Sequence, residues 1–169
     1  MDPFALPLHV ADFSTTGRVA VGAVAGLVAT VAMNVPMHRL PEGSTPPFVA
    51  AGALTGEGPA DVDPVLASGT HYAAGVLGGG FYTVVSLVAE GLYAPDLYIV
   101  RAGQPLVAHV LAVLATFAFL VAFFAYLVLP RFGGPVYERA RLVRRDWTVS
   151  AAVYALALAV VVPLLLAYV

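Results

Sequence analysis

The segment HYAAGVLGGGFYTVVSLVAEGLY, residues 71–93, decides the fold. It matches the roughly 20 apolar residues that a helix needs to cross a bilayer. Its polar groups and its glycines recur every three or four residues, which is the spacing of one helix face; they are His71, Gly75, Gly79, Tyr82, Ser86 and Glu90. Because lipid offers polar groups no hydrogen-bond partner, we expect this stripe to face the interior of a helix bundle.

Three further segments are long and apolar enough to span a membrane, at about residues 19–38, 106–129 and 147–169. Across the chain, 60% of residues are hydrophobic and only 11% are charged, and the mean hydropathy is +0.89. A soluble domain carries about 25% charged residues. The composition therefore excludes a free soluble protein, a disordered chain and a basic nucleic-acid binder. It predicts an all-α, four-transmembrane-helix antiparallel bundle that forms a single membrane domain, residues 1–169.

The distribution of arginine predicts how this bundle is oriented. Lysine and cysteine are absent, a composition typical of GC-rich genomes and suggestive of an archaeal source. Four spans place loops 39–70 and 130–146 on one side of the membrane, and these loops hold most of the arginines. The positive-inside rule then makes both loops cytoplasmic and places both termini outside the cell membrane. The loop arginines are Arg39, Arg131, Arg139, Arg141, Arg144 and Arg145, against Arg18 and Arg101 on the other side.

The two cytoplasmic loops have different characters. The first is rich in proline and glycine, which indicates irregular backbone with at most a short interfacial helix over residues 48–54. In the second, residues 136–146 have helical spacing and predict a short surface helix. Its arginines would bind anionic lipid headgroups, each contributing about 1 kcal/mol; they are Arg139, Arg141, Arg144 and Arg145. The lipid bilayer is thus the first expected partner.

Small residues predict which helices are neighbours. Gly22 and Gly26 in the first span, and Gly75 and Gly79 in the second, have the four-residue spacing that lets two helices approach closely. We therefore expect the first two spans to pack through these glycines. In the third span the spacing predicts a packing seam formed by His109, Ala112, Thr116, Phe119, Phe123 and Tyr126.

Glu90 and His109 form the candidate intramembrane polar pair. Each lies about one turn inside the same membrane boundary, Glu90 near the end of the second span and His109 near the start of the third. Ionisable groups within a span are functional candidates by default. The alternative, which the sequence favours, is a structural hydrogen bond that joins the two helices, directly or through one water.

Three of the histidines are candidate ligands for a metal ion or a haem. Met33, Met37, His38 and His71 combine thioether and imidazole groups, which suit a soft ion such as Cu(I). The alternative is that the methionines fill gaps and the histidines are interfacial, and we expect no metal and no cofactor. A haem held by His71 and His109 is excluded, because the second span rises about 28 Å from His71 to Glu90 and His109 lies at the Glu90 end. A shallow haem held by His38 and His71 is left as an alternative.

No motif of an intramembrane hydrolase or of a phosphate-binding loop is present, so we expect no enzymatic activity. The stretches GAVAGLVATVAMNVPM (22–37) and HYAAGVLGGGFY (71–82) resemble a family of uncharacterised small four-helix integral membrane proteins of haloarchaea and other prokaryotes. That resemblance implies four spans and no particular activity. The leading hypothesis is a multi-pass accessory or oligomeric subunit, a homo-oligomer or part of a larger membrane complex, with no nucleic-acid partner. The alternative is a small permease or a proton- or ion-conducting unit that uses the polar stripe of the second span.

Overall fold

The structure, a computed structural model, describes residues 13–93, 98–99 and 102–168. Four helical rods in this part of the chain are long and apolar enough to cross a membrane. The predicted all-α architecture is confirmed. The rods are α2 (Thr15–Arg39), α4 (Pro64–Leu92), the segment Leu106–Phe132, and the segment Gly134–Tyr168, most of which is α7 (Ala140–Tyr168).

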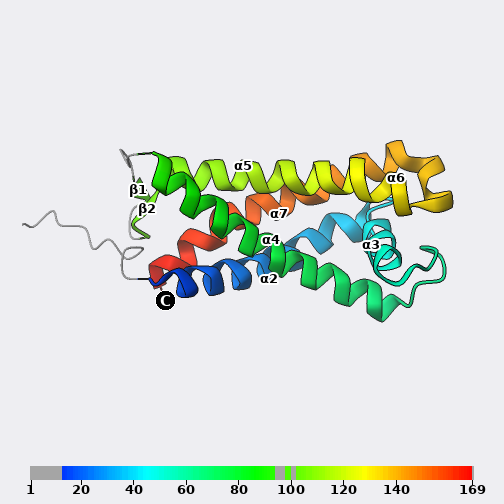
Figure 1. Ribbon diagram of the computed structural model, residues 1–169, viewed down its shortest axis with the longest axis horizontal. Helices are drawn as coiled ribbons and strands as arrows, with labels where there is room; N and C mark the ends of the chain where they lie inside the picture. Colours follow the sequence, from blue (N-terminus) through cyan, green and yellow to red (C-terminus); the bar gives the residue numbers. More distant parts are fainter. Residues whose placement is uncertain (1–12, 94–97, 100–101, 169) are drawn as a thin grey trace, which may run out of the picture.

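The four rods form an antiparallel bundle in which each rod packs against two others. Helix α2 contacts α4 and α7, and α5 (Leu106–Ala122) contacts the same two helices from the other side. The start of α2, the end of α7 and the short antiparallel pair β1 (Tyr98–Ile99) and β2 (Gln104–Pro105) lie at one end, here called the termini end (Figure 1). The short helix α3 (Thr45–Thr55) covers the opposite end, here called the α3 end.

Local capping explains where two of the spans begin. The Ser14 side chain accepts a hydrogen bond from the Gly17 N–H and starts α2. Asp63 accepts from the first two N–H groups after Pro64, which starts α4 seven residues before the predicted boundary at residue 71. Such side chains satisfy N–H groups that have no partner within the helix. The predicted short helix at 48–54 is present as α3, three residues longer at its start.

The third rod contains an irregular turn that the sequence did not reveal. After α5 it continues as a π-helical segment, Phe123–Val128, and ends as α6, Leu129–Phe132. The predicted seam is wrong beyond Thr116. The side chains of Phe119, Phe123 and Tyr126 are 41%, 46% and 70% exposed, and the buried residues are instead Phe124, Ala125 and Val128. Buried positions four residues apart drift around a regular α-helix by about 40° each time, and the wider π-helical turn compensates for this drift.

The second of the two loops predicted to be cytoplasmic is shorter than predicted, and its surface helix is not separate from the fourth rod. A 3-10 helix, Gly134–Arg139, leads directly into α7, so the predicted loop residues 140–146 are the first turns of the fourth rod. These turns have a buried face. Val143 is fully buried in a cluster with Val49 and Phe124, and Asp146 is also fully buried. Packing against α3 and the third rod therefore makes α7 begin at Ala140, before the apolar segment predicted to start at residue 147.

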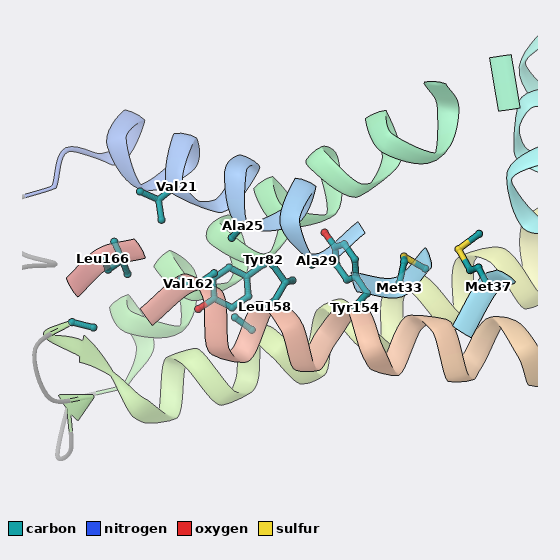
Figure 2. Packing of buried hydrophobic residues seen from close by; sticks show 12 residues of the cluster. Val21, Ala25, Ala29, Met33, Met37, Tyr82, Tyr154, Leu158, Val162 and Leu166 are labelled. Atoms are coloured by element: carbon teal, nitrogen blue, oxygen red, sulfur yellow. The ribbon is translucent and has the colours of Figure 1, made fainter. Parts of the chain in front are cut away.

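The closest helix contact joins α2 to α4 through glycine, as the four-residue spacing led us to expect. A Cβ atom added at Gly79 would collide with the backbone of Gly22 and Gly26, and one added at Gly26 would collide with the Gly75 carbonyl. On the adjacent face of α2, small and medium side chains meet α7. Figure 2 shows this core, which includes Val21, Ala25, Ala29, Met33, Met37, Tyr82, Tyr154, Leu158, Val162 and Leu166.

Candidate functional site

A partly buried ion pair joins α2 to α4 at the termini end. Arg18 forms a two-pronged ion pair with Glu90, with Nη1–Oε2 at 2.7 Å and Nη2–Oε1 at 2.5 Å. The two side chains are only 11% and 18% exposed. A paired guanidinium and carboxylate satisfy each other's charge in a poorly hydrated site, which neither group would do alone.

Hydrogen bonds extend this pair across α4 to the loop before α5. Ser86 donates to Glu90 Oε1 at 3.0 Å. The Gln104 side-chain amide donates to the Tyr82 hydroxyl at 2.7 Å and lies 3.5 Å from Ser86 Oγ. All three of these bridging side chains are almost fully buried. The result is a six-residue network, consisting of Arg18, Tyr82, Ser86, Glu90, Gln104 and His109.

His109 completes the network and connects it to α7. Because Tyr82 accepts from Gln104, its own hydroxyl proton is free to be donated to His109 Nδ1, 2.5 Å away. The other ring nitrogen, Nε2, then carries the proton and donates to the Ala159 carbonyl at 3.1 Å. That carbonyl lies four residues before Pro163, which has no N–H to offer it. His109 therefore replaces the helical hydrogen bond that Pro163 removes.

The structure does not join Glu90 directly to His109, the pair proposed from the sequence. Among the described residues, Glu90 bonds to Arg18 and Ser86, and His109 bonds to Tyr82 and the Ala159 carbonyl. The two groups are instead connected through Ser86, Gln104 and Tyr82. Sequence reasoning missed Arg18, which it counted only as a loop charge. Its opposite charge at the depth of Glu90 on an antiparallel neighbour was the signal that could have identified it.

The network is closely packed. The cavity beside it, lined by Arg18, Tyr82, Ser86 and Gln104 among others, has a volume of about 10 Å³, roughly enough for a single water molecule. Gln104 Oε1 is the one buried side-chain polar atom in the described part of the chain that has no hydrogen-bond partner. The site thus holds its helices together and leaves little room for a substrate.

The polar stripe of α4 is interrupted in the middle of the bundle. Between Tyr82 and His71 its members are Gly79 and Gly75, and both are pressed against α2. Tyr154 of α7 closes the same region from the other side by donating to the Gly75 carbonyl at 2.6 Å. The stripe therefore forms two separate polar groups, one at each end.

The second polar group surrounds a cavity of about 290 Å³ at the α3 end, between α2, α3 and α4. Asn34 organises it. Its side-chain oxygen lies 2.9 Å from His71 Nε2, its side-chain nitrogen donates to the Tyr72 hydroxyl at 3.0 Å, and its backbone carbonyl lies 2.7 Å from His38 Nδ1. The lining residues are Asn34, Met37, His38, Ser44, Pro47, Phe48, Ala67, Ser68, His71 and Tyr72.

The four candidate metal ligands, Met33, Met37, His38 and His71, do not all meet at this cavity. His38, His71 and Met37 line it, whereas Met33 is buried in the core between α2 and α7. Within the described residues, no group of three or more His, Cys, Asp or Glu side chains is arranged to hold a metal ion.

The arginines expected to bind lipid headgroups are mostly engaged within the protein. Arg139 pairs with Glu42 at 2.8 Å, and Arg145 pairs with the buried carboxylate of Asp146 at 2.7 Å. Asp146 also accepts a hydrogen bond from the Glu42 backbone N–H. This bond and the Arg139–Glu42 pair join the fourth rod to the segment before α3.

Arg144 is held by the π-helical turn. In that turn the Leu129 N–H bonds to the Phe124 carbonyl, and residue 130 is a proline, so the Ala125 carbonyl has no helical donor. Arg144 Nε donates to this carbonyl at 3.0 Å, and its guanidinium lies over the rings of Tyr126 and Tyr137. Arg141, by contrast, is exposed.

Comparison of the chain with family models, with curated proteins and with solved structures gave no match. The function must therefore be argued from the geometry of the bundle.

Proposed function

We propose that this chain is a non-enzymatic, multi-pass protein of the cell membrane that acts through packing, as an accessory or oligomeric subunit. Four long apolar helices are compatible with a membrane protein. The observation that carries the finer proposal is the closed interior. The polar groups at the termini end are bound to one another, and the middle of the stripe is covered by direct backbone contact between α2 and α4.

The outer surface of the bundle supports a role in association. The third rod has the lowest buried fraction of the four spans. Phe119 stacks between Phe81 and Phe123 on its surface, with ring centroids at 4.6 Å and 5.3 Å, and is itself 41% exposed. An aromatic surface of this kind suits packing against lipid or against another membrane helix. A homo-oligomer, or a larger membrane complex, would use this face.

The proposed topology keeps loops 39–70 and 130–146 in the cytoplasm and both termini outside. The pairing of Arg18 with Glu90 supports it, because it leaves the side that holds the termini with one fewer free positive charge.

The alternative is a permease or ion-conducting unit that uses the stripe of α4. It would require α2 and α4 to separate at Gly26 and Gly79, so that the two polar groups become connected. The cavity beside His71 is the observation in its favour, because it reaches the first residue of the stripe.

One pair of measurements separates the two functions. The purified protein reconstituted in liposomes is tested for collapse of a pH gradient and of a K⁺ gradient, and its mass in lipid nanodiscs is determined by native mass spectrometry. We expect leakage no faster than from protein-free liposomes, and a mass that is a multiple of the 17.5 kDa chain. Flux that disappears in Glu90→Gln but persists in Glu138→Gln, a change at an exposed carboxylate, would instead establish the conducting unit. A monomer that causes no leakage and captures no partner after cross-linking in cells would contradict the subunit proposal.

A further inference from the structure

We propose that the cavity at the α3 end binds one late first-row transition-metal ion through the imidazoles of His38 and His71. Both rings line the same space of about 290 Å³, although they come from different helices, α2 and α4. This inference goes beyond a packing function and does not involve the network at the termini end.

Asn34 prepares both imidazoles as ligands. Its backbone carbonyl accepts the proton of His38 Nδ1, and its side-chain oxygen accepts the proton of His71 Nε2. The side-chain oxygen is assigned to His71 because the amide nitrogen of the same group donates to Tyr72. The lone pairs of the neutral rings therefore remain on His38 Nε2 and His71 Nδ1. Metal-binding histidines in proteins almost always donate their other ring proton to a carbonyl or carboxylate in this way.

The composition of the lining selects the class of ion. Imidazole nitrogen suits Zn²⁺, Cu²⁺ and Ni²⁺, whereas Mg²⁺ and Ca²⁺ prefer carboxylate oxygens. The residues that line the cavity include no aspartate or glutamate, but they do include Met37, whose thioether is a soft ligand. Two imidazoles leave further coordination positions for the thioether and for water, and the cavity has room for them. The site is thus an open one, in which the protein does not fill every coordination position.

The cavity also explains why an ion would be taken up by the folded bundle. His38 is exposed and lies in the last turn of α2, while His71 is partly buried. An ion held between them would connect α2 to α4 at the end where glycine contact no longer does so. Binding to the folded state alone raises thermal stability.

The test is a titration of the tag-free full-length protein in detergent micelles with Co²⁺ alone, followed by displacement with Zn²⁺ alone. We expect one equivalent of Co²⁺ per chain, with visible d–d absorption that Zn²⁺ abolishes. His38→Ala and His71→Ala should each weaken binding by at least about tenfold, and Asn34→Ala by about 10–100-fold through loss of ligand orientation. His9→Ala, which changes a histidine that the proposed site does not include, is the control and should bind as the wild type does.

A second readout guards against variants that fold poorly. Zn²⁺ should raise the Tm of the wild type and of His9→Ala, but not that of His38→Ala, whose exposed ring contributes little to the metal-free fold. Binding that is absent in the wild type, that survives in both His38→Ala and His71→Ala, or that is lost equally in His9→Ala would overturn the proposal.

Discussion

The two ends of the bundle use the same kinds of side chain in opposite ways. At the termini end, six polar residues bond to one another around a space of about 10 Å³. At the α3 end, two histidines and an asparagine surround a space of about 290 Å³ and retain unused ring nitrogens. Both groups begin from the same stripe of α4, and the glycine contact with α2 separates them.

This contrast teaches that polarity inside a span is not by itself evidence of a ligand site. Where nearly every donor and acceptor has a protein partner, the polar groups hold helices in register. Where bonds orient the side chains but leave coordinating atoms free, the same residue types are prepared for an external partner. The ends of one stripe can therefore have a structural role and a binding role.

The largest effect is expected where the two ends are separated. Gly79→Leu would force a Cβ atom into the backbone of Gly22 and Gly26, which no side-chain rotation can relieve. We expect a loss of at least about 3 kcal/mol in the free energy of unfolding, measured by SDS titration in mixed micelles. Gly80→Leu is the matched control, because a Cβ atom there meets nothing within 4 Å. Equal stability of the two variants would show that the glycine contact does not separate the two polar groups of the stripe.

Breaking the ion pair should be the next largest effect and should be confined to the termini end. Glu90→Gln leaves the Arg18 guanidinium without its anion in a poorly hydrated site. We expect it to destabilise the protein by about 3 kcal/mol, the low end for a buried pair because both side chains retain some exposure. In a double-mutant cycle, Arg18→Gln combined with Glu90→Gln should cost clearly less than the sum of the single changes. Strict additivity would show that the pair is not coupled.

The same chemical change made at both ends gives a direct comparison. Tyr82→Phe leaves His109 Nδ1 without its donor and removes the closer of the two acceptors of Gln104 in a buried site, which should cost about 1–3 kcal/mol. Tyr72→Phe removes a hydroxyl that accepts from Asn34 on an exposed ring, and should cost less than about 0.5 kcal/mol. Thermal unfolding of the two variants in the same detergent measures the difference. Similar losses would mean that the α3 end is as closely bonded as the termini end.

The smallest effect on stability is expected for single cysteine substitutions. Labelling of these cysteines determines which end of the bundle faces the cytoplasm. The chain has no cysteine, and Glu138 lies exposed at the α3 end. Glu138→Cys should leave stability unchanged and resist a membrane-impermeant maleimide in intact cells, but react after lysis, because the positive-inside rule places that end in the cytoplasm. Thr16→Cys, exposed at the termini end, should show the reverse pattern. Labelling of Glu138→Cys in intact cells would invert the proposed topology.

Much of the architecture could be predicted from the sequence, because bilayer thickness and hydrophobic length leave few alternatives. The four spans and the glycine contact between the first two follow from run length and from four-residue spacing. The ends of the helices were harder to predict from the sequence. The start of α4 depends on the cap at Asp63. The first turns of α7 depend on burial of Val143 and Asp146 against α3 and the residues before it, which are far away in the sequence.

The partners of the site residues were harder to predict than their positions. Glu90 and His109 were correctly placed within the stripe and the seam, but each has a nearer partner than the other. Matched depth along the membrane does not specify the rotation of a helix, and rotation decides whether Glu90 meets Arg18 or His109. The role of His109 also depends on a carbonyl made free by Pro163 on a third helix. Such a contact is visible only once the helices are packed.

The π-helical turn at Phe123–Val128 has a consequence for how the third rod tolerates changes in length. Such a turn accommodates one residue more than an α-helical turn over the same distance. Deleting a residue there should therefore leave the buried faces on both sides, at Thr116 and at Leu129, pointing as they do now. The same deletion within α5 would rotate everything beyond it by about 100°. The π-helical turn is thus a place where the third rod can lose one residue while the part beyond the turn still faces the bundle.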